Sequence, residues 1–201
     1  MYKITIKYYD KNIIIINKPV GIEVNKILKI KIKNNIPNKG ILNRLDKYTS
    51  GIIMIARNLV FYYFYKKIIL LQIIKKKYIV FVDNKTNNGF INLSILKKKK
   101  ISIEQFSKKS LSFYKKIKKL KSQTLLFVYI KTGRTHQIRK HLIHCGIMIK
   151  NEFYYNKIKK FINTLHFKTV SFFYPFNLKI LKLSCNIPNE MKKIFLINFL
   201  K

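Results

Sequence analysis

Hydrophobic and polar positions alternate, or gather in short apolar runs, along most of this chain, and both patterns are typical of β-strands. Alternation predicts a first strand at residues 2–8. Runs bounded by Gly, Pro or Asn predict further strands at residues 12–17, 51–56, 77–83, 90–93, 110–117, 124–131, 164–173 and 178–184. Residues 22–42 show no clear period and indicate a loop. The chain is therefore predicted to be rich in strands.

Helical spacing is confined to a few segments. Asn58 can cap a helix that runs to about Ile74. Thr135 can cap a short helix that ends at Gly146, and Pro188 opens a terminal helix. Because neither a repeat nor a linker interrupts the pattern, we expect one domain over residues 1–201. Its predicted fold class is α+β, with a mostly antiparallel mixed sheet flanked by helices.

The charge of the chain is strongly positive. Forty-three Lys and Arg against seven Asp and Glu give a formal net charge of +36. Such a chain attracts polyanions and binds nucleic acid at least non-specifically, through counterion release. The lysine-rich runs at 75–77, 97–100 and 115–121 can equally be solvated faces enlarged by an AT-rich codon bias. The charge therefore supports an RNA or DNA partner without identifying one.

Other sequence features bound the location of the chain. No apolar stretch approaches the roughly eighteen residues of a membrane span. The first residues lack the apolar core of a signal peptide. Cys145 and Cys185 are the only cysteines and give no disulfide framework. We therefore expect a soluble, cytoplasmic protein.

Arginine is rare, and its positions are not random. Only four of the basic residues are arginine: Arg44 lies in segment 43–51, and Arg134 and Arg139 lie in segment 132–141. Arg57 falls outside both segments, and its role is left open. Lysine cannot replace a guanidinium where bidentate or stacked geometry is needed. We therefore expect the chemistry of the chain in these two segments.

Asp46 is the main candidate in the first segment, because it stands between a loop and a buried strand. Residues 133–135 form a tight entry to a helix N-terminus, which favours anions, and His136 and Arg139 share a face of that helix. Arg139 is thus able to reach a carboxylate and favour its ionised form. Asp46 as a turn aspartate bonded to its own backbone, or as half of a structural ion pair, remains the alternative.

Metal binding and two other chemistries find little support in the sequence. His136, His141, His144 and Cys145 resemble a ligand cluster, but the five-residue step from 136 to 141 turns the first imidazole away. A structural or RNA-contacting role of these histidines is favoured. The sequence contains neither a nucleophile elbow nor a phosphate-binding glycine loop. We predict no metal and no cofactor.

The two segments resemble the RluA family of RNA pseudouridine synthases. The family pattern His-Arg-Leu-Asp followed by Thr-Ser-Gly is matched at residues 43–46 and 49–51. The family pattern Thr-Gly-Arg-Thr-His-Gln-Ile-Arg-x-His is matched in full at residues 132–141. Residues 77–80 resemble the Lys-x-Tyr strand of the family, and weaker similarity at 9–21, 146–155 and 165–175 extends the match over nearly the whole chain.

The resemblance implies an active-site cleft across the sheet and a role for each matched residue. Asp46 would be the catalytic aspartate, Tyr78 would stack on the flipped base, and Arg139 would pair with Asp46. Arg44 would fill the place of the flipped uridine or hold the distorted RNA. Arg134 and His136 would contact RNA at the start of the short helix that Thr135 precedes. The implied substrate is structured RNA, large-subunit ribosomal RNA before tRNA, and we expect a monomer.

The sequence departs from the family at several positions. Asn43 replaces the usual histidine, and Asn151-Glu152 replaces Gly-Asp. We also expect no separate N-terminal RNA-binding domain. The main alternative function is a non-catalytic basic protein that binds RNA or assists ribosome assembly and retains the fold. A weaker alternative is a metal-dependent nuclease that uses the histidines.

Overall fold

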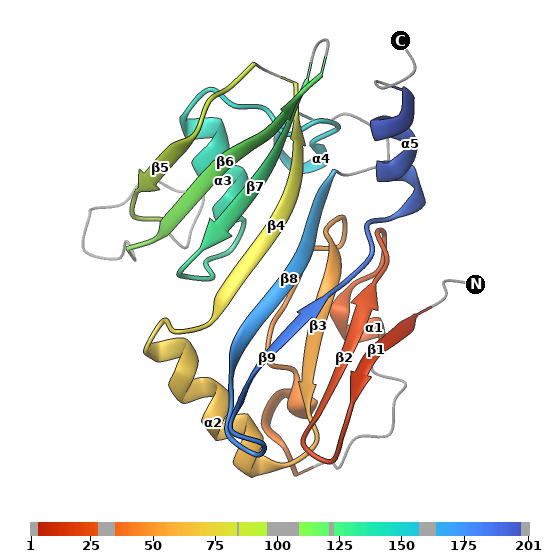
Figure 1. Ribbon diagram of the computed structural model, residues 1–201, viewed down its shortest axis with the longest axis vertical. Helices are drawn as coiled ribbons and strands as arrows, with labels where there is room; N and C mark the ends of the chain where they lie inside the picture. Colours follow the sequence, from red (N-terminus) through yellow and green to blue (C-terminus); the bar gives the residue numbers. More distant parts are fainter. Residues whose placement is uncertain are drawn as a thin grey trace.

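The computed structural model describes residues 4–27, 35–83, 85–95, 109–120, 123–156 and 164–197. Nine strands form one sheet across these residues (Figure 1). The strands are β1 (Thr5–Tyr9), β2 (Ile13–Lys18), β3 (Ser50–Ala56), β4 (Lys75–Val82), β5 (Gly89–Asn92), β6 (Leu111–Lys119), β7 (Thr124–Ile130), β8 (Leu165–Tyr174) and β9 (Lys179–Ser184). The helices are α1 (Val24–Ile27), α2 (Leu59–Leu70), α3 (Gln137–His144), α4 (Phe153–Asn156) and α5 (Asn189–Ile197), with a 3₁₀ turn η1 (Pro37–Gly40).

The sheet is mixed and mostly antiparallel, as predicted. Its order is β1-β2-β3-β8-β4-β7-β6-β5, and β9 pairs with β8 outside this path. Among the described strand pairs only β3 and β8 run parallel. β4 and β8 connect the end of the sheet that holds β1–β3 with the end that holds β5–β7 (Figure 1). The predicted α+β class is confirmed.

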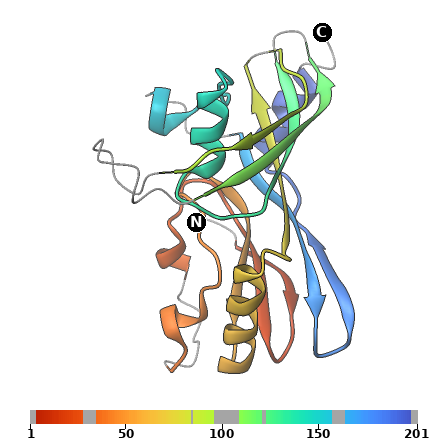
Figure 2. The same cartoon turned by 90° about the vertical axis from the view of Figure 1, so that its left-hand side faces the viewer.

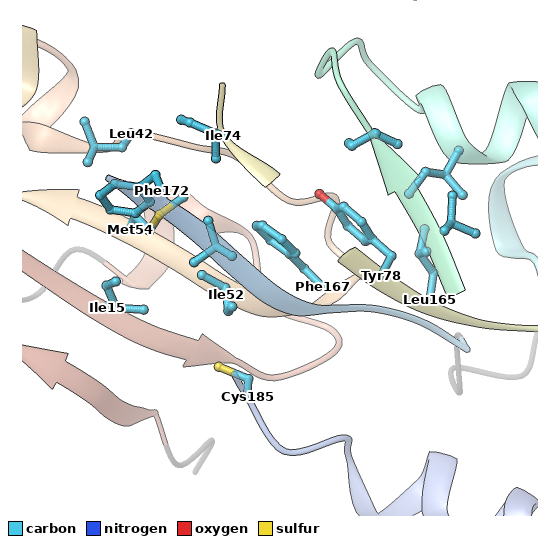
Figure 3. Close-up of a cluster of buried hydrophobic side chains, with 14 of the residues drawn as sticks. Ile15, Leu42, Ile52, Met54, Ile74, Tyr78, Leu165, Phe167, Phe172 and Cys185 are labelled. Carbon is cyan, nitrogen blue, oxygen red and sulfur yellow. The ribbon is translucent and has the colours of Figure 1, made fainter. Parts of the chain in front are cut away.

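Both faces of the sheet are covered, but by different helices. The largest core cluster joins α2 and α3 to one face through residues such as Tyr65 and Ile138. Figure 3 shows part of this cluster around Phe167. α1 packs on the side of β2 and β3 that faces away from α2. Met191 of α5 packs on Ile79 and other residues of β4 and β7, on the side that faces away from α3. Figure 2 shows α3 and α4 on one side of the strands. β3 is buried along its whole length because clusters lie on both of its faces.

A glycine permits the one parallel contact. Gly51 has φ +117°, and a Cβ built on it would lie 2.3 Å from the carbonyl oxygen of Phe167 in β8. Only glycine adopts this conformation without strain and leaves room for the neighbouring backbone. The Thr-Ser-Gly segment that follows Asp46 is therefore fixed against β8.

Three of the sequence-based assignments differ from the structure. Residues 2 and 3 of the first predicted strand lie outside the described part of the chain, and the observed strand begins at Thr5. The described residues of the segment 22–42 contain α1 and η1 rather than loop alone. α2 is capped by Asn58 as predicted, since its side chain accepts from Phe61 N at 2.9 Å, but the helix ends at Leu70. Residues 71–74 continue the apolar spacing without the helix, because the backbone turns at Gln72 (φ +55°).

The predicted cap of α3 is also wrong. The residue before the helix is His136, in the left-handed conformation at φ +54°, and no side chain caps the helix from that position. Gln137 organises the entrance instead: its Oε1 accepts from Arg134 N at 3.0 Å and from Thr132 Oγ1 at 2.8 Å. The predicted end at Gly146 is correct, with φ +66° just after the helix.

Candidate active site

Asp46 lies in a loop that is held on both sides. Thr49 N donates to Asp46 O at 3.0 Å, which closes a turn just before β3. Upstream, Asn43 Nδ2 donates to Ile52 O at 2.9 Å and Asn43 Oδ1 accepts from Met54 N at 2.7 Å. An amide can make both bonds at once, so asparagine anchors the loop to β3 at the position where the family has histidine. The Asp46 side chain keeps 26% of its surface exposed.

Arg139 is the centre of the site, and it is fully buried. Its Nε donates to Asp46 Oδ2 at 3.1 Å and its Nη2 donates to Thr49 Oγ1 at 2.9 Å. Its Nη1 donates to Glu152 Oε2. The guanidinium carbon also lies 4.9 Å from the ring centroid of Tyr154. The planar, five-donor group thus joins three partners and a ring in a way that lysine cannot, and the predicted pairing of Arg139 with Asp46 is present.

Glu152 is a part of the site that the sequence analysis did not identify. It is fully buried, and its Oε1 accepts from Tyr154 N at 2.9 Å while Oε2 bonds Arg139. Asn151 before it adopts φ +56°, the conformation that the glycine of the family pattern would favour. Both departures from the family therefore occupy positions with a definite structural task. The available signal was that Glu152 is one of only seven acidic residues.

His136 lies between Asp46 and an aromatic cluster. Its Nε2 is 3.6 Å from Asp46 Oδ1, and its Nδ1 is 3.1 Å from Tyr155 Oη. Its ring centroid is 4.6 Å from that of Tyr154. Burial lowers the pKa of His136, and the charge of Asp46 opposes that effect. Burial thus favours the neutral imidazole, and a left-handed backbone at such a place is typical of functional sites.

Lys18 is a second buried group that the sequence analysis did not identify. It has no exposed surface, and its Nζ donates to Pro19 O at 2.9 Å, Ile22 O at 2.8 Å and Lys47 O at 3.1 Å. Burial lowers its pKa to about 8, against the opposing charge of Asp46. Lys18 thus connects the end of β2 with Lys47, the residue next to Asp46, and it holds the Asp46 loop against β2.

Tyr78 lies at the junction of the core and the site. Its ring stacks on Phe167, with centroids 4.5 Å apart and planes 10° from parallel (Figure 3). Burial, and then the charge of Asp46, raise the pKa of Tyr78 above its ordinary value. Because Phe167 covers one face of the ring, only the opposite face of Tyr78 can meet another group.

The remaining candidate residues differ in their surroundings. Arg44 and Arg134 are both exposed, Arg44 on the Asp46 loop and Arg134 at the entrance of α3. His141 is buried, with Nε2 3.0 Å from Ser110 Oγ and Nδ1 2.9 Å from Ser112 Oγ. Since both ring nitrogens are engaged, His141 joins α3 to β6 and is not arranged as a metal ligand.

Arg57 has a structural role. Its Nη1 donates to Asp10 O at 2.5 Å, and its guanidinium carbon lies 4.5 Å from the ring centroid of Tyr9. Arg57 N also donates to Asn12 O at 2.8 Å. It holds the turn between β1 and β2 against the end of β3.

No helix in the described part of the chain is both long and apolar enough to cross a membrane.

Comparisons with known proteins identify the family of this chain. Residues 12–144 match the family described as RNA pseudouridylate synthase. The chain is 32% identical to ribosomal large subunit pseudouridine synthase D of Buchnera aphidicola subsp. Schizaphis graminum (strain Sg), over 94% of this chain and 71% of that protein. It is 31% identical to ribosomal large subunit pseudouridine synthase C of Buchnera aphidicola subsp. Acyrthosiphon pisum (strain APS), over 70% of this chain and 50% of that protein.

A solved structure shows the same fold at lower identity. Human RNA pseudouridylate synthase domain containing 4 superposes with a TM-score of 0.76 and 20% identity, over 93% of this chain and 90% of the human one. The family match covers well over half of the chain, including the segments that carry Asp46 and Arg139. The chain therefore belongs to the RluA family of RNA pseudouridine synthases.

Proposed function

We propose that this pseudouridine synthase modifies a uridine of large-subunit ribosomal RNA, with Asp46 as the group that attacks or otherwise activates the nucleotide. The substrate is inferred from relatives that are named for the ribosomal large subunit. The net charge of +36 suits a partner with a dense phosphate backbone. Transfer RNA is the second candidate substrate.

One observation carries the role of Asp46: a fully buried arginine holds a carboxylate that itself reaches the surface. Arg139 bonds Oδ2, whereas Oδ1 lies 3.6 Å from His136 Nε2, beyond hydrogen-bond range. We therefore expect Oδ1 to face the nucleotide. Because Arg139 is also fixed by Glu152 and Thr49, the carboxylate is positioned before RNA binds.

The target uridine has to leave its stack before this carboxylate can reach it. Extrusion costs roughly a few kcal/mol in lost stacking and pairing. Stacking on an aromatic ring returns about 1–3 kcal/mol per base. In our proposal Tyr78 supplies that ring, and Arg44 on the same loop as Asp46 fills or braces the vacated position. Arg134 and His136 contact the RNA near the entrance of α3.

The reaction is an isomerisation. The bond between uracil N1 and ribose C1′ breaks, a bond between C5 and C1′ forms, and the hydrogen on C5 is lost to solvent while N1 gains one. Asp46 can serve by attacking the ribose or by removing a ribose proton, and both routes end with the same loss of the C5 hydrogen. The chemistry balances without an oxidant, a reductant or an energy source.

Tritium release from ribosomal RNA labelled at C5 of uridine tests this proposal. We expect Asp46→Asn to lower the rate by roughly 10²–10⁴-fold or more, because the amide carries no negative charge. Asp83→Asn is the matched control, since Asp83 is an exposed carboxylate paired with Lys150 at 3.5 Å. Its rate should equal that of the wild type.

The same assay decides between the proposal and its rival. A non-catalytic RNA-binding protein would release no tritium with either ribosomal RNA or tRNA, and Asp46→Asn would change nothing. Release with labelled tRNA but not with ribosomal RNA would overturn the substrate while leaving the role of Asp46 intact. RNA binding by Asp46→Asn should stay near the wild-type level in a filter-binding assay.

A further inference from the structure

A row of exposed aromatic side chains crosses the sheet on the face opposite to the active site. Phe90 of β5 lies opposite Phe113 of β6, and Phe113 lies opposite Tyr129 of β7. Directly opposite residues of antiparallel strands point to the same face. These three residues form the aromatic row, with exposed fractions of 65%, 41% and 37%.

The alternation of the strands places this row away from Asp46. Ser112, Tyr114 and Val128 are buried toward α3, where Gln137 Nε2 donates to Ser112 Oγ at 3.1 Å. Their neighbours Phe113 and Tyr129 therefore point to the other face, since successive side chains alternate. In Figure 2, α3 and α4 lie on one side of these strands, so the row faces the opposite side. The proposed active site does not use it.

Lysines surround the rings. Lys77 of β4 lies opposite Tyr129 and continues the row, and its Nζ is 4.6 Å from the ring centroid of Phe127. In the next row Lys115 lies opposite Phe127. Because successive side chains alternate, Lys75 joins Lys77 and Lys115 on this face. None of the strands β4, β5, β6 and β7 contains an acidic residue. These four strands thus present aromatic rings and lysines on this face without a carboxylate.

We propose that the aromatic row binds single-stranded RNA by stacking two or three unpaired bases on Phe90, Phe113 and Tyr129. A sheet that presents aromatic rings from adjacent strands is a general solution for binding unpaired bases. The ring centroids of Phe113 and Tyr129 are 6.0 Å apart, with planes tilted by 35°, so each ring can receive its own base. Lys77 and Lys115 supply contacts to the phosphates.

Charge favours RNA over the other occupants. A second copy of this chain would bring Lys75, Lys77 and Lys115 against the same three residues of the first copy, and like charges repel. A duplex would hide its bases from the rings, because only unpaired bases can splay onto them. The apolar part of the same face that needs a protein cover already has one, since Met191 of α5 packs on Ile79 and Leu125.

The probe is fluorescein-labelled oligoadenylate RNA of about ten nucleotides, long enough to cover a site of ordinary size for a single strand. It contains no uridine, so it cannot be a substrate of the active site. We expect Phe113→Ala with Tyr129→Ala to weaken binding by about tenfold for each ring removed. Phe113→Leu with Tyr129→Leu should weaken binding similarly, because leucine keeps apolar area but cannot stack. Both double variants should leave unchanged the slope of the logarithm of the binding constant against the logarithm of the salt concentration. Lys115→Gln should reduce the magnitude of this slope by about one.

Two controls isolate the effect. Phe173→Ala removes an exposed ring of β8, 44% exposed, outside the row, and it should bind like the wild type. The same oligoadenylate paired with its complement should be insensitive to loss of the rings. Far-UV circular dichroism and thermal melts of each variant verify that the fold persists, which is expected for changes at surface positions.

Several results would overturn the inference. One is oligoadenylate binding at the wild-type level in the double alanine variant or in the double leucine variant. Another is a dimer of the wild-type protein in sedimentation experiments that dissociates when the rings are substituted. The inference is also separable from the proposed function. Asp46→Asn should bind oligoadenylate like the wild type, and the double leucine variant should keep its maximal rate of tritium release at saturating RNA.

Discussion

At the scale of single residues, the site depends on how one buried guanidinium is shared. An unpaired buried charge is very costly, so Arg139 requires a carboxylate that is buried with it. Glu152 is that partner, since both side chains have no exposed surface, whereas Asp46 remains partly exposed. Glu152 therefore acts as a positioning residue that holds Arg139, and Arg139 in turn orients Asp46.

We predict that Glu152→Gln impairs both folding and catalysis. Removing one partner of a buried ion pair costs about 3–5 kcal/mol in the free energy of unfolding. If Arg139 then shifts, kcat for tritium release should fall more than KM rises, because orientation matters for the reaction more than for RNA binding. Urea unfolding and steady-state kinetics measure the two effects.

A matched pair of variants distinguishes positioning from general loss of stability. Glu152→Asp keeps the charge with a shorter side chain, and it should recover a large part of kcat. Glu190→Gln, a change at an exposed glutamate of α5, should alter neither quantity. If Glu152→Gln lowered stability while kcat at low temperature stayed at the wild-type value, Glu152 would have no positioning role.

Some contacts of single residues could be predicted from the sequence, and others could not. The pairing of Arg139 with Asp46 was predictable, because both lie in short segments that retain rare residue types. Glu152 and Lys18 were not identified. Lys18 reads as one lysine among many until its Nζ is seen to donate to three carbonyls. A hydrogen bond across the fold leaves no pattern in the sequence, unlike a helix cap.

At the scale of elements, the parallel pair of β3 and β8 brings the Asp46 loop to the centre of the sheet. Ser50 pairs with His166, and Gly51 pairs with Phe167. Ser50 Oγ lies 2.9 Å from His166 Nδ1, and His166 has no exposed surface. This contact could not be predicted from the local pattern, because 116 residues separate its two partners. Asn58 could be predicted as a cap because it bonds a backbone group only three residues away.

We predict that His166 makes the fold sensitive to mild acid. Burial lowers the pKa of His166 from 6.5 to about 4, so the unfolded chain takes up this proton first as the pH falls. The stability associated with His166 is complete above about pH 6.5, declines between about pH 6.5 and 4, and then levels off. Its full extent is roughly 3 kcal/mol. Urea unfolding at pH 7.5, 6 and 5 measures the decline.

His166→Asn isolates this contribution, because the amide can keep a hydrogen bond to Ser50 but does not titrate. Its unfolding free energy should vary less with pH than that of the wild type over this window. Burial also lowers the pKa of His136 and His141, and both remain in the variant. Only the difference between the two proteins therefore reports on His166, and equal pH dependence would contradict its role.

At the scale of the whole molecule, the charge of +36 acts on folding and on binding in opposite directions. Like charges on a compact surface repel, so the charge opposes folding while it favours association with RNA. Sequence composition predicts this conflict directly. It does not predict that β4 and β6 bring their lysines to neighbouring parts of one sheet, because that depends on the strand order.

We therefore predict that added salt raises the stability of the RNA-free protein and lowers its affinity for RNA. Sodium chloride screens surface charges over about 10 Å at 0.1 M, so Tm of the RNA-free protein should rise between about 10 and 200 mM salt. Relief of about 2 kcal/mol would raise Tm by roughly 4–8 °C for a chain of this size. Over the same range RNA affinity should fall, because releasing counterions from the phosphates gains less entropy as the bulk salt concentration rises. Glutamine at Lys115, Lys116, Lys118 and Lys119 should reduce both responses. A Tm that stays constant or falls with added salt would show that self-repulsion does not limit the stability of this fold.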